Sequence, residues 1–173
     1  MKAELSARDY GLIAAGAALL LDQATKLILL YGLGFAAEPY QSHVIPVFPF
    51  FNVVMVWNPG VSYGLLAAHT LFARVLLVVL ALALIAGLAY WMWHTTRLTL
   101  AIGLGLVIGG AIGNNLIDRI IYGQVADFFH FYAYGYDWYV FNVADAAITF
   151  GVIAMLYDAL LKPESKPAGS SSG

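Results

Sequence analysis

Four long apolar stretches recur along the chain. They cover about residues 9–32, 71–93, 98–122 and 138–161, and each reaches the roughly 20 mostly apolar residues that a membrane-spanning helix needs. Strands of a membrane β-barrel are roughly ten residues long and alternate apolar with polar positions. These stretches are longer and continuously apolar. The pattern therefore predicts an all-α membrane protein with four transmembrane helices.

The two longer connections, about 33–70 and 123–137, have a different composition. The first contains HVIPVFPFFNVVMVWN, which is rich in β-branched and aromatic residues and predicts a small β-rich subdomain outside the membrane. The second is almost entirely aromatic, which is typical of a loop at the membrane interface. We expect residues 1–162 to form one domain. The low-complexity tail 163–173 is expected to be disordered, its last residues being an expression-tag remnant.

Composition supports the membrane assignment and narrows the chemistry. The 173 residues are 62% hydrophobic and 10% charged, against roughly 25% charged in soluble domains. No cysteine is present, and the histidines form no metal-ligand spacing, so we expect no metal and no cofactor. A net charge of −2 with dispersed basic residues argues against nucleic-acid binding. The partners expected from composition are membrane lipids.

The basic residues at the helix ends predict the orientation. Five of them share one side of the membrane if four spans alternate, and the two long connections lie on the other side. Because cytoplasmic connections carry an excess of lysine and arginine, both termini are predicted to be cytoplasmic. The five residues are Lys2, Arg8, Arg97, Lys162 and Lys166.

Several charged residues lie inside the spans, where charge is costly and therefore a candidate for function. Asp22 and Lys26 are four residues apart, the spacing of a same-face helical ion pair, which a structural role would also explain. Asn115, Asp118 and Arg119 are spaced i, i+3 and i+4. This spacing places Asn115 on the side of both charged residues, although Asp118 and Arg119 could equally form a neutral structural pair.

Two further carboxylates stand in apolar surroundings near the outer membrane boundary. Asp127 follows the third span, and Asp145 lies seven residues into the fourth, one turn after Asn142. Two desolvated carboxylates that face each other share a proton, which supplies the acid and base of an aspartic protease. The alternative is two unrelated acids. Ordinary boundary or interfacial roles are expected for other polar residues, namely Asp137, Asp158 and His130.

Read in order, the motifs DQATK, NPGVSYG, NLIDR, QVADF and FNVAD resemble those of lipoprotein signal peptidase (signal peptidase II). The resemblance runs from about Asp22 to Gly151. It implies a bacterial inner-membrane aspartyl endopeptidase whose site faces the outer side. The implied substrates are diacylglyceryl-modified prolipoproteins, cut before the lipidated cysteine, and the implied inhibitors are of the globomycin type.

The resemblance also implies residue roles. Asp127 and Asp145 match the catalytic pair. Positions matching substrate-binding residues are Asn58, Gly60, Asn115, Arg119 and Asn142, and those matching supporting residues are Asp22, Lys26 and Asp118.

Two departures from the family pattern stand out. The asparagine three residues before Asp118 is preceded by Asn114, where the family has glycine, so either Asn114 or Asn115 faces the substrate; the helical spacing favours Asn115. Tyr63 and Gly64 replace the residues usual in the NPG motif.

Two other classes remain open on the residues alone. A transporter or ion channel would use intramembrane Asp and Arg along a path through the membrane. Here four acids, Asp22, Asp118, Asp127 and Asp145, map to the outer third, and Asp158 alone lies near the other face. A scaffold protein would need only the glycine-rich packing face formed by Gly105, Gly109 and Gly113. It would leave the two desolvated aspartates unexplained.

Overall fold

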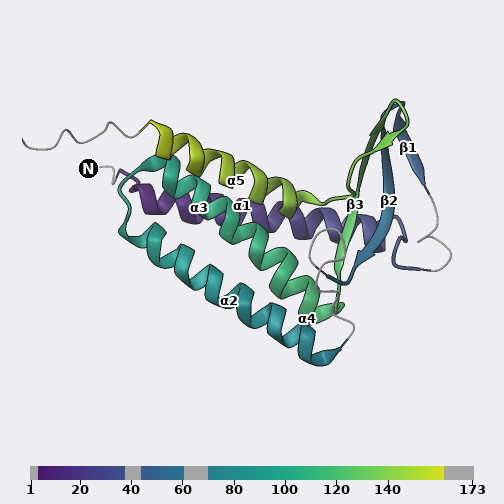
Figure 1. The fold of residues 1–173 in the computed structure, drawn as a ribbon, viewed down its shortest axis with the longest axis horizontal. Coiled ribbons are helices and arrows are strands. Elements are labelled where there is room, and N and C mark those ends of the chain that lie inside the picture. The colour runs from purple at the N-terminus through teal and green to yellow at the C-terminus, as the bar shows by residue number, and fades with distance from the viewer. Residues whose placement is uncertain (1–3, 38–43, 61–69, 162–173) are drawn as a thin grey trace, which may run out of the picture.

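The computed structural model describes residues 4–37, 44–60 and 70–161. Within these ranges, four helices are long and apolar enough to cross a membrane, so the prediction of four spans is confirmed. They lie side by side as an elongated bundle, and a small antiparallel sheet projects from one end (Figure 1). The helical segments are α1 (Ala7–Leu27), continued by the π-helical η1 (Ile28–Gly32), α2 (Leu71–His94), α3 (Leu98–Ala111), continued by the π-helical η4 (Ile112–Asp118) and by α4 (Arg119–Ile121), and α5 (Val143–Leu160).

The fourth span begins later than predicted. Asn142 is the N-cap of α5: its side chain accepts the backbone N–H of Asp145, whose carboxylate in turn accepts the backbone N–H of Asn142. This capping box satisfies N–H groups that a helix start leaves without partners. Asp145 is therefore in the first turn of α5, and the prediction that it lies seven residues into the span was wrong. The preceding residue Phe141 pairs with Phe129 of the sheet instead.

The sheet has the order β1-β2-β3-β4, with β1 at Ile45–Phe48, β2 at Phe51–Asn58, β3 at Val125–Ala133 and β4 at Tyr136–Asp137. The predicted β-rich subdomain is confirmed, but the expected aromatic loop after the third span is mostly strand. Its residues pair with those of β2; Phe51, for example, lies opposite Phe131, and Val53 opposite Phe129. Strand pairing satisfies backbone groups that an irregular loop would leave to water.

Close helix packing explains the glycines of the third span. Gly105 and Gly109 face the backbone of α1 at Gly11 and Ala15, and a Cβ at either position would collide with it. Gly110 faces α5 in the same way, against Ala144. Small residues let membrane helices approach until their backbones touch. This places α3 between α1 and α5, and it is the most buried of the four spans.

Substituting Gly105 by alanine is expected to lower the free energy of unfolding by roughly 1–3 kcal/mol, because the added methyl group overpacks the α1–α3 contact. Gly87 of α2 provides the matched control, since a Cβ there meets nothing within 4 Å. Gly87→Ala should be neutral or slightly stabilising, as alanine is the better helix former. Unfolding of both variants in detergent micelles checks this, and equal stabilities would contradict the packing argument.

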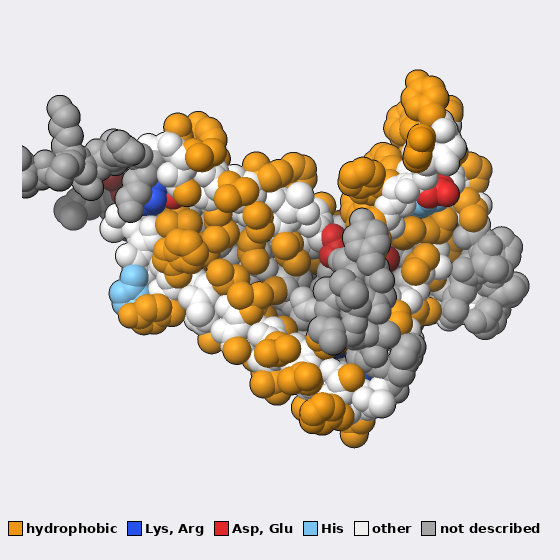
Figure 2. All heavy atoms as spheres, viewed as in Figure 1, with side chains coloured by type: hydrophobic (Ala, Val, Ile, Leu, Met, Phe, Trp, Pro, Cys, Tyr) orange, Lys and Arg blue, Asp and Glu red, His pale blue; other side chains and the backbone are white. Residues whose placement is uncertain are grey.

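The two ends of the bundle differ. The start of α1, the α2–α3 connection and the end of α5 lie together at the end away from the sheet (Figure 1). Apolar side chains cover the visible face of the bundle, and carboxylates come to view where the bundle meets the sheet (Figure 2). Several sequence predictions fall outside the described residues: the charges of Lys2, Lys162 and Lys166, the later part of the NPG motif with Tyr63 and Gly64, and the tail 163–173.

Candidate active site

A cavity of about 220 Å³ lies where the spans meet the sheet, and both Asp127 and Asp145 line it. We call it the acid cavity. It collects side chains from β2, η4, β3 and α5, which are far apart in the chain. Six of the residues expected from sequence line it directly, and Asn142 lies buried beside them. The lining residues are Asn58, Gly60, Asn114, Asn115, Arg119, Val125, Asp127, Tyr139, Asp145 and Ile148.

Asp127 reaches the cavity from the third residue of β3 and is 2% exposed. Its two carboxylate oxygens accept from two amides: the Asn58 Nδ2 at 3.1 Å and the Asn142 Nδ2 at 2.7 Å. Burial, and after it the negative charge of Asp145, raise the pKa of Asp127 to about 7. At neutral pH this carboxyl therefore holds a proton for a large part of the time.

Asp145 enters the cavity from the first turn of α5. Besides the capping contact with Asn142, its other oxygen accepts the Asn114 Nδ2 at 3.0 Å. The two aspartates are thus bridged by one asparagine, because Asn142 contacts both. The capping box that starts α5 consequently also fixes the rotamer of the acid, which ties the helix boundary to the geometry of the site.

A buried ion cluster of Asp22, Lys26 and Asp118 lies next to the acid cavity and contacts its lining residue Asn114. Lys26 Nζ lies 2.8 Å from Asp22 Oδ2 and 2.7 Å from Asp118 Oδ2, and all three side chains are at most 3% exposed. Lys26 also donates to Asn114 Oδ1 at 2.7 Å. The predicted same-face pair of α1 is present. Asp118 pairs with Lys26 and not with its neighbour Arg119, so the alternative of a neutral Asp118–Arg119 pair was wrong.

Arg119 holds the segment that follows β2. Its Nη1 donates to the carbonyl of Pro59 at 3.3 Å and its Nη2 to that of Gly60 at 2.5 Å. Asn58 caps the same turn, because its Oδ1 accepts the backbone N–H of Gly60. Arg119 is buried, and these bonds fix the edge of the cavity where Gly60 lies.

Three polar residues expected at boundaries lie away from the cavity. His130 of β3 is 3.2 Å from Asp137, whose side chain is 79% exposed, and Asp158 pairs with Arg97 at 2.9 Å near the opposite end of the bundle. Arg97 also bonds the backbone carbonyl of Asp158. Among the described residues, no three His, Cys, Asp or Glu side chains come together as a metal site.

Sequence reasoning missed Val125, Ile148 and one polar side chain of the cavity, Tyr139. The Tyr139 hydroxyl accepts the Asn58 Nδ2 at 3.0 Å, so Asn58 divides its two amide hydrogens between Tyr139 and Asp127. Tyr139 belongs to an aromatic run that predicted only an interfacial position. Nothing in the periodicity of that run distinguishes it, because its contact with Asn58 spans 81 residues of sequence.

Comparison with known proteins identifies the group to which this arrangement belongs. A family profile described as Signal peptidase (SPase) II matches residues 14–161. This chain belongs to the signal peptidase II family. Signal peptidase II enzymes are proteases, and the chain is a membrane protein with four spans. The transporter alternative is not supported.

Relatives within the signal peptidase II family match over most of their length. A lipoprotein signal peptidase of Rhodopseudomonas palustris (strain TIE-1) is 49% identical over 155 residues, which cover 87% of this chain and 92% of the relative. A lipoprotein signal peptidase of Methylocella silvestris is 44% identical over 168 residues, which cover 97% of this chain and 95% of the relative. A solved bacterial membrane enzyme structure, obtained by the in meso method, superposes with a TM-score of 0.76 at 26% identity and covers 92% of each chain.

The π-helix explains how this chain departs from the signal peptidase II pattern. Three residues separate the Gly113–Asn114 pair from Asp118. In the family pattern two residues separate Gly-Asn from Asp-Arg, so this chain has one residue more. A π turn closes i→i+5 bonds and so accommodates one extra residue in a helix. Asn114 therefore contacts Asp145 and Asn142, while Asn115 contacts only Arg119 Nε, at 3.4 Å. Helical spacing and the count of residues back from Asp118 both favoured Asn115; the Gly-Asn order of the family pattern, read forward from Gly113, would have pointed to Asn114.

Proposed function

We propose that this protein is an aspartyl endopeptidase that removes signal peptides from prolipoproteins within the membrane, with Asp127 and Asp145 as its catalytic pair. The observation that carries the proposal is two carboxyls that both accept hydrogen bonds from Asn142 and line one cavity of a signal peptidase II fold. The relatives are named lipoprotein signal peptidases, which supports the substrate class. The finer substrate is a diacylglyceryl-modified precursor, cut before its lipidated cysteine.

The proposed mechanism uses one proton shared by the pair. The ionised carboxyl takes a proton from a water molecule, whose oxygen attacks the scissile carbonyl carbon. The protonated carboxyl hydrogen-bonds the carbonyl oxygen as it gains negative charge. Collapse of the tetrahedral intermediate breaks the C–N bond and passes a proton to the leaving amine. Because the pair titrates as a unit, the two roles are assigned to the pair and not to single residues.

Substrate positioning is assigned to the amides and to the Gly60 edge of the cavity. An extended peptide needs hydrogen-bond partners for its backbone when it leaves water. The amide hydrogens of Asn58, Asn114 and Asn142 bond the acid pair and its neighbours in the free protein, so a bound peptide backbone takes over part of these bonds beside the turn held by Arg119. We assign Asp22, Lys26 and Asp118 the supporting role of holding Asn114 and the start of α5 in place.

The proposed location is a bacterial inner membrane, with the sheet and the acid cavity on the outer side. Arg8 and Arg97 lie at the bundle end opposite the sheet, which the positive-inside rule assigns to the cytoplasm. The test is incubation of the detergent-purified protein with a diacylglyceryl-modified precursor peptide. Mass spectrometry should find one cut, before the lipidated cysteine, and globomycin-type inhibitors should block it. An intact precursor after long incubation would overturn the proposal.

Of the two neighbouring asparagines, Asn114 is expected to matter more for cleavage. Asn114→Ala removes the amide that contacts Asp145 and should lower kcat by about tenfold or more. Asn115→Ala is the matched control, because it loses only the long contact with Arg119, and its kcat should stay within about threefold of wild type. A larger loss of kcat in Asn115→Ala than in Asn114→Ala would show that Asn115, and not Asn114, is the asparagine that acts in cleavage.

The raised pKa of Asp127 predicts an alkaline limit to activity. Cleavage should decline as pH rises above about 7, because Asp127 then loses the proton that the pair needs. The folded state also binds this proton more tightly than the unfolded chain, so stability should fall as pH rises from about 3.8 to about 7. Unfolding of wild type and Asp127→Asn across this range measures the second effect. An equal pH slope in both proteins would contradict it.

A further inference from the structure

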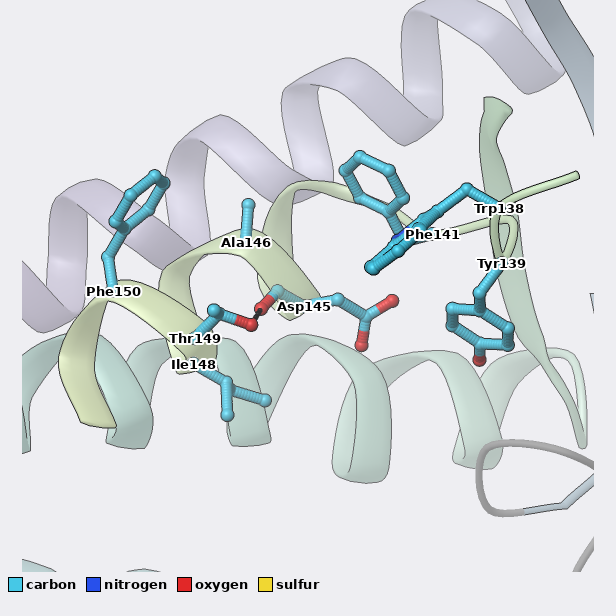
Figure 3. Close-up of a pocket in the computed structure, with 8 residues that line it drawn as sticks. All are labelled: Trp138, Tyr139, Phe141, Asp145, Ala146, Ile148, Thr149 and Phe150. Carbon is cyan, nitrogen blue, oxygen red and sulfur yellow. Dashed lines mark hydrogen bonds between the residues drawn. The ribbon is translucent and has the colours of Figure 1, made fainter. Parts of the chain in front are cut away.

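A second, larger space adjoins the acid cavity on the outer face of α5. It is an open groove of about 540 Å³ formed by residues 138–141 and the first two turns of α5, and Figure 3 shows its lining. Asp145, Tyr139 and Ile148 line both spaces, so the groove and the acid cavity meet at the carboxylate. The remaining lining residues are Trp138, Phe141, Ala146, Thr149 and Phe150.

The groove is apolar beyond Asp145. The Thr149 hydroxyl donates to the backbone carbonyl of Asp145 at 2.8 Å, so its hydrogen is used inside the helix. Phe150 and Trp138 are 64% and 71% exposed and lie at opposite ends of the groove (Figure 3). An extended peptide needs partners for its backbone groups in this environment, and the groove offers few. Its chemistry suits a hydrocarbon.

The direction of the groove suits a lipid chain as well. It follows α5 from Asp145 to Phe150, about 7.5 Å along the helix axis at 1.5 Å per residue. Because α5 crosses the membrane, the groove runs from the acid pair toward the membrane interior. A hydrocarbon chain attached near the scissile bond would enter it in the direction in which the chains of the bilayer already lie.

Two alternatives fit less well. A signal-peptide helix is 10–12 Å wide, so a single turn occupies roughly 400–600 Å³, and the groove would hold about one turn. A separate cavity of about 400 Å³ lies between α2 and α4, but its lining includes Arg74 and Arg119, and neither aspartate of the pair lines it. Of these two spaces, only the α5 groove is lined by Asp145.

We propose, resting on the function above, that the α5 groove binds an acyl chain of the diacylglyceryl group on the substrate cysteine. Ala146 is the specificity-determining residue of this site. Ala146 follows Asp145 in the chain, and its methyl group lies between Phe150 and Trp138, the two aromatic ends of the groove (Figure 3), so a larger side chain there fills space that the acyl chain needs.

The first test compares two precursor peptides that differ only in lipid length: one carries hexadecanoyl chains and the other acetyl groups. Wild type should cleave the long-chain peptide with a kcat/KM at least about tenfold higher. Ala146→Phe should lose this preference, through its effect on the long-chain peptide, and keep its acetyl-peptide rate within about twofold. Ala159→Phe, at the far and exposed end of α5, is the matched control and should keep the preference. An unchanged preference in Ala146→Phe, or an equal loss on both peptides as expected if the groove holds peptide, would overturn the proposal.

The second test does not depend on turnover. The Asp127→Asn variant is irradiated with the long-chain peptide carrying a photoreactive diazirine in one acyl chain, and the crosslinked residues are mapped. Labelling should fall within residues 138–150 and disappear in the Asp127→Asn/Ala146→Phe double variant. Labelling of residues 71–79, or equal labelling of 138–150 by a diazirine phosphatidylglycerol, would contradict a substrate-specific site. The crosslinks can be mapped even if the protein does not cleave the peptide. The result therefore tests acyl-chain binding in the groove independently of the proposed catalytic function.

Discussion

Replacing either Asp127 or Asp145 by asparagine is expected to lower the cleavage rate at least about 10³-fold while leaving the fold intact. Asparagine matches the volume of aspartate and keeps an oxygen that can accept the bonds from Asn142, but it can neither take up nor release the proton that the pair shares. The loss should be similar in the two variants, because the carboxyls act as a unit. Their double replacement should cost little more than either alone.

Folding must be checked separately in these variants. Asp145→Asn changes the capping box of α5, which we expect to cost no more than about 1 kcal/mol. Asp137→Asn is the matched control, since that carboxylate is exposed and pairs with His130 outside the acid cavity; it should cleave at the wild-type rate. Thermal unfolding and the elution volume in detergent report the fold, and initial rates on the lipidated precursor report catalysis. A folded Asp127→Asn or Asp145→Asn protein that keeps a tenth of the wild-type rate would remove that residue from the mechanism.

Replacing Lys26 by methionine is expected to give the largest loss of stability of any single substitution considered, about 3–5 kcal/mol. The change leaves the carboxylates of Asp22 and Asp118 buried without the cation that both contact, and removing one partner of a buried ion pair is costly. Asn114 also loses a donor, so residual folded protein should cleave slowly. Denaturant unfolding in micelles measures the first effect.

Two comparisons make the Lys26 prediction specific. Arg8→Met removes a pair that is more than a third exposed, and its unfolding free energy should stay within about 1 kcal/mol of wild type. Adding Asp118→Asn to Lys26→Met should recover part of the loss, because one uncompensated charge is removed. Equal unfolding free energies of Lys26→Met and Arg8→Met would show that the buried ion cluster of Asp22, Lys26 and Asp118 contributes no more to stability than an exposed ion pair.

The sheet shows where sequence patterns were weakest. The β-branched and aromatic residues of the first outer connection predicted strands, and β1 and β2 are there. The aromatic run after the third span predicted a loop, yet it forms β3 and β4. Its residues are apolar on both faces, so no alternation is visible until β2 is known to be its partner. Strand pairing across about 70 residues is a tertiary property that a local pattern does not contain.

The sequence by itself determined that the protein lies in a membrane and which charged residues are candidates for its site. Continuous apolar stretches of about 20 residues require lipid. Most of the charged residues in these stretches or just after them lie in or around one cavity of the structure; they are Asp22, Lys26, Asp118, Arg119, Asp127 and Asp145. Apart from the Asp22–Lys26 pair, only the tertiary structure decided their partners. Lys26 joins Asp118 across 92 residues of chain, Asn142 bridges the two acids, and the π turn brings Asn114 to Asp145. The physical reason is that charge and hydropathy are properties of single residues, whereas a hydrogen bond depends on where the packing of α1, α3 and α5 places two of them.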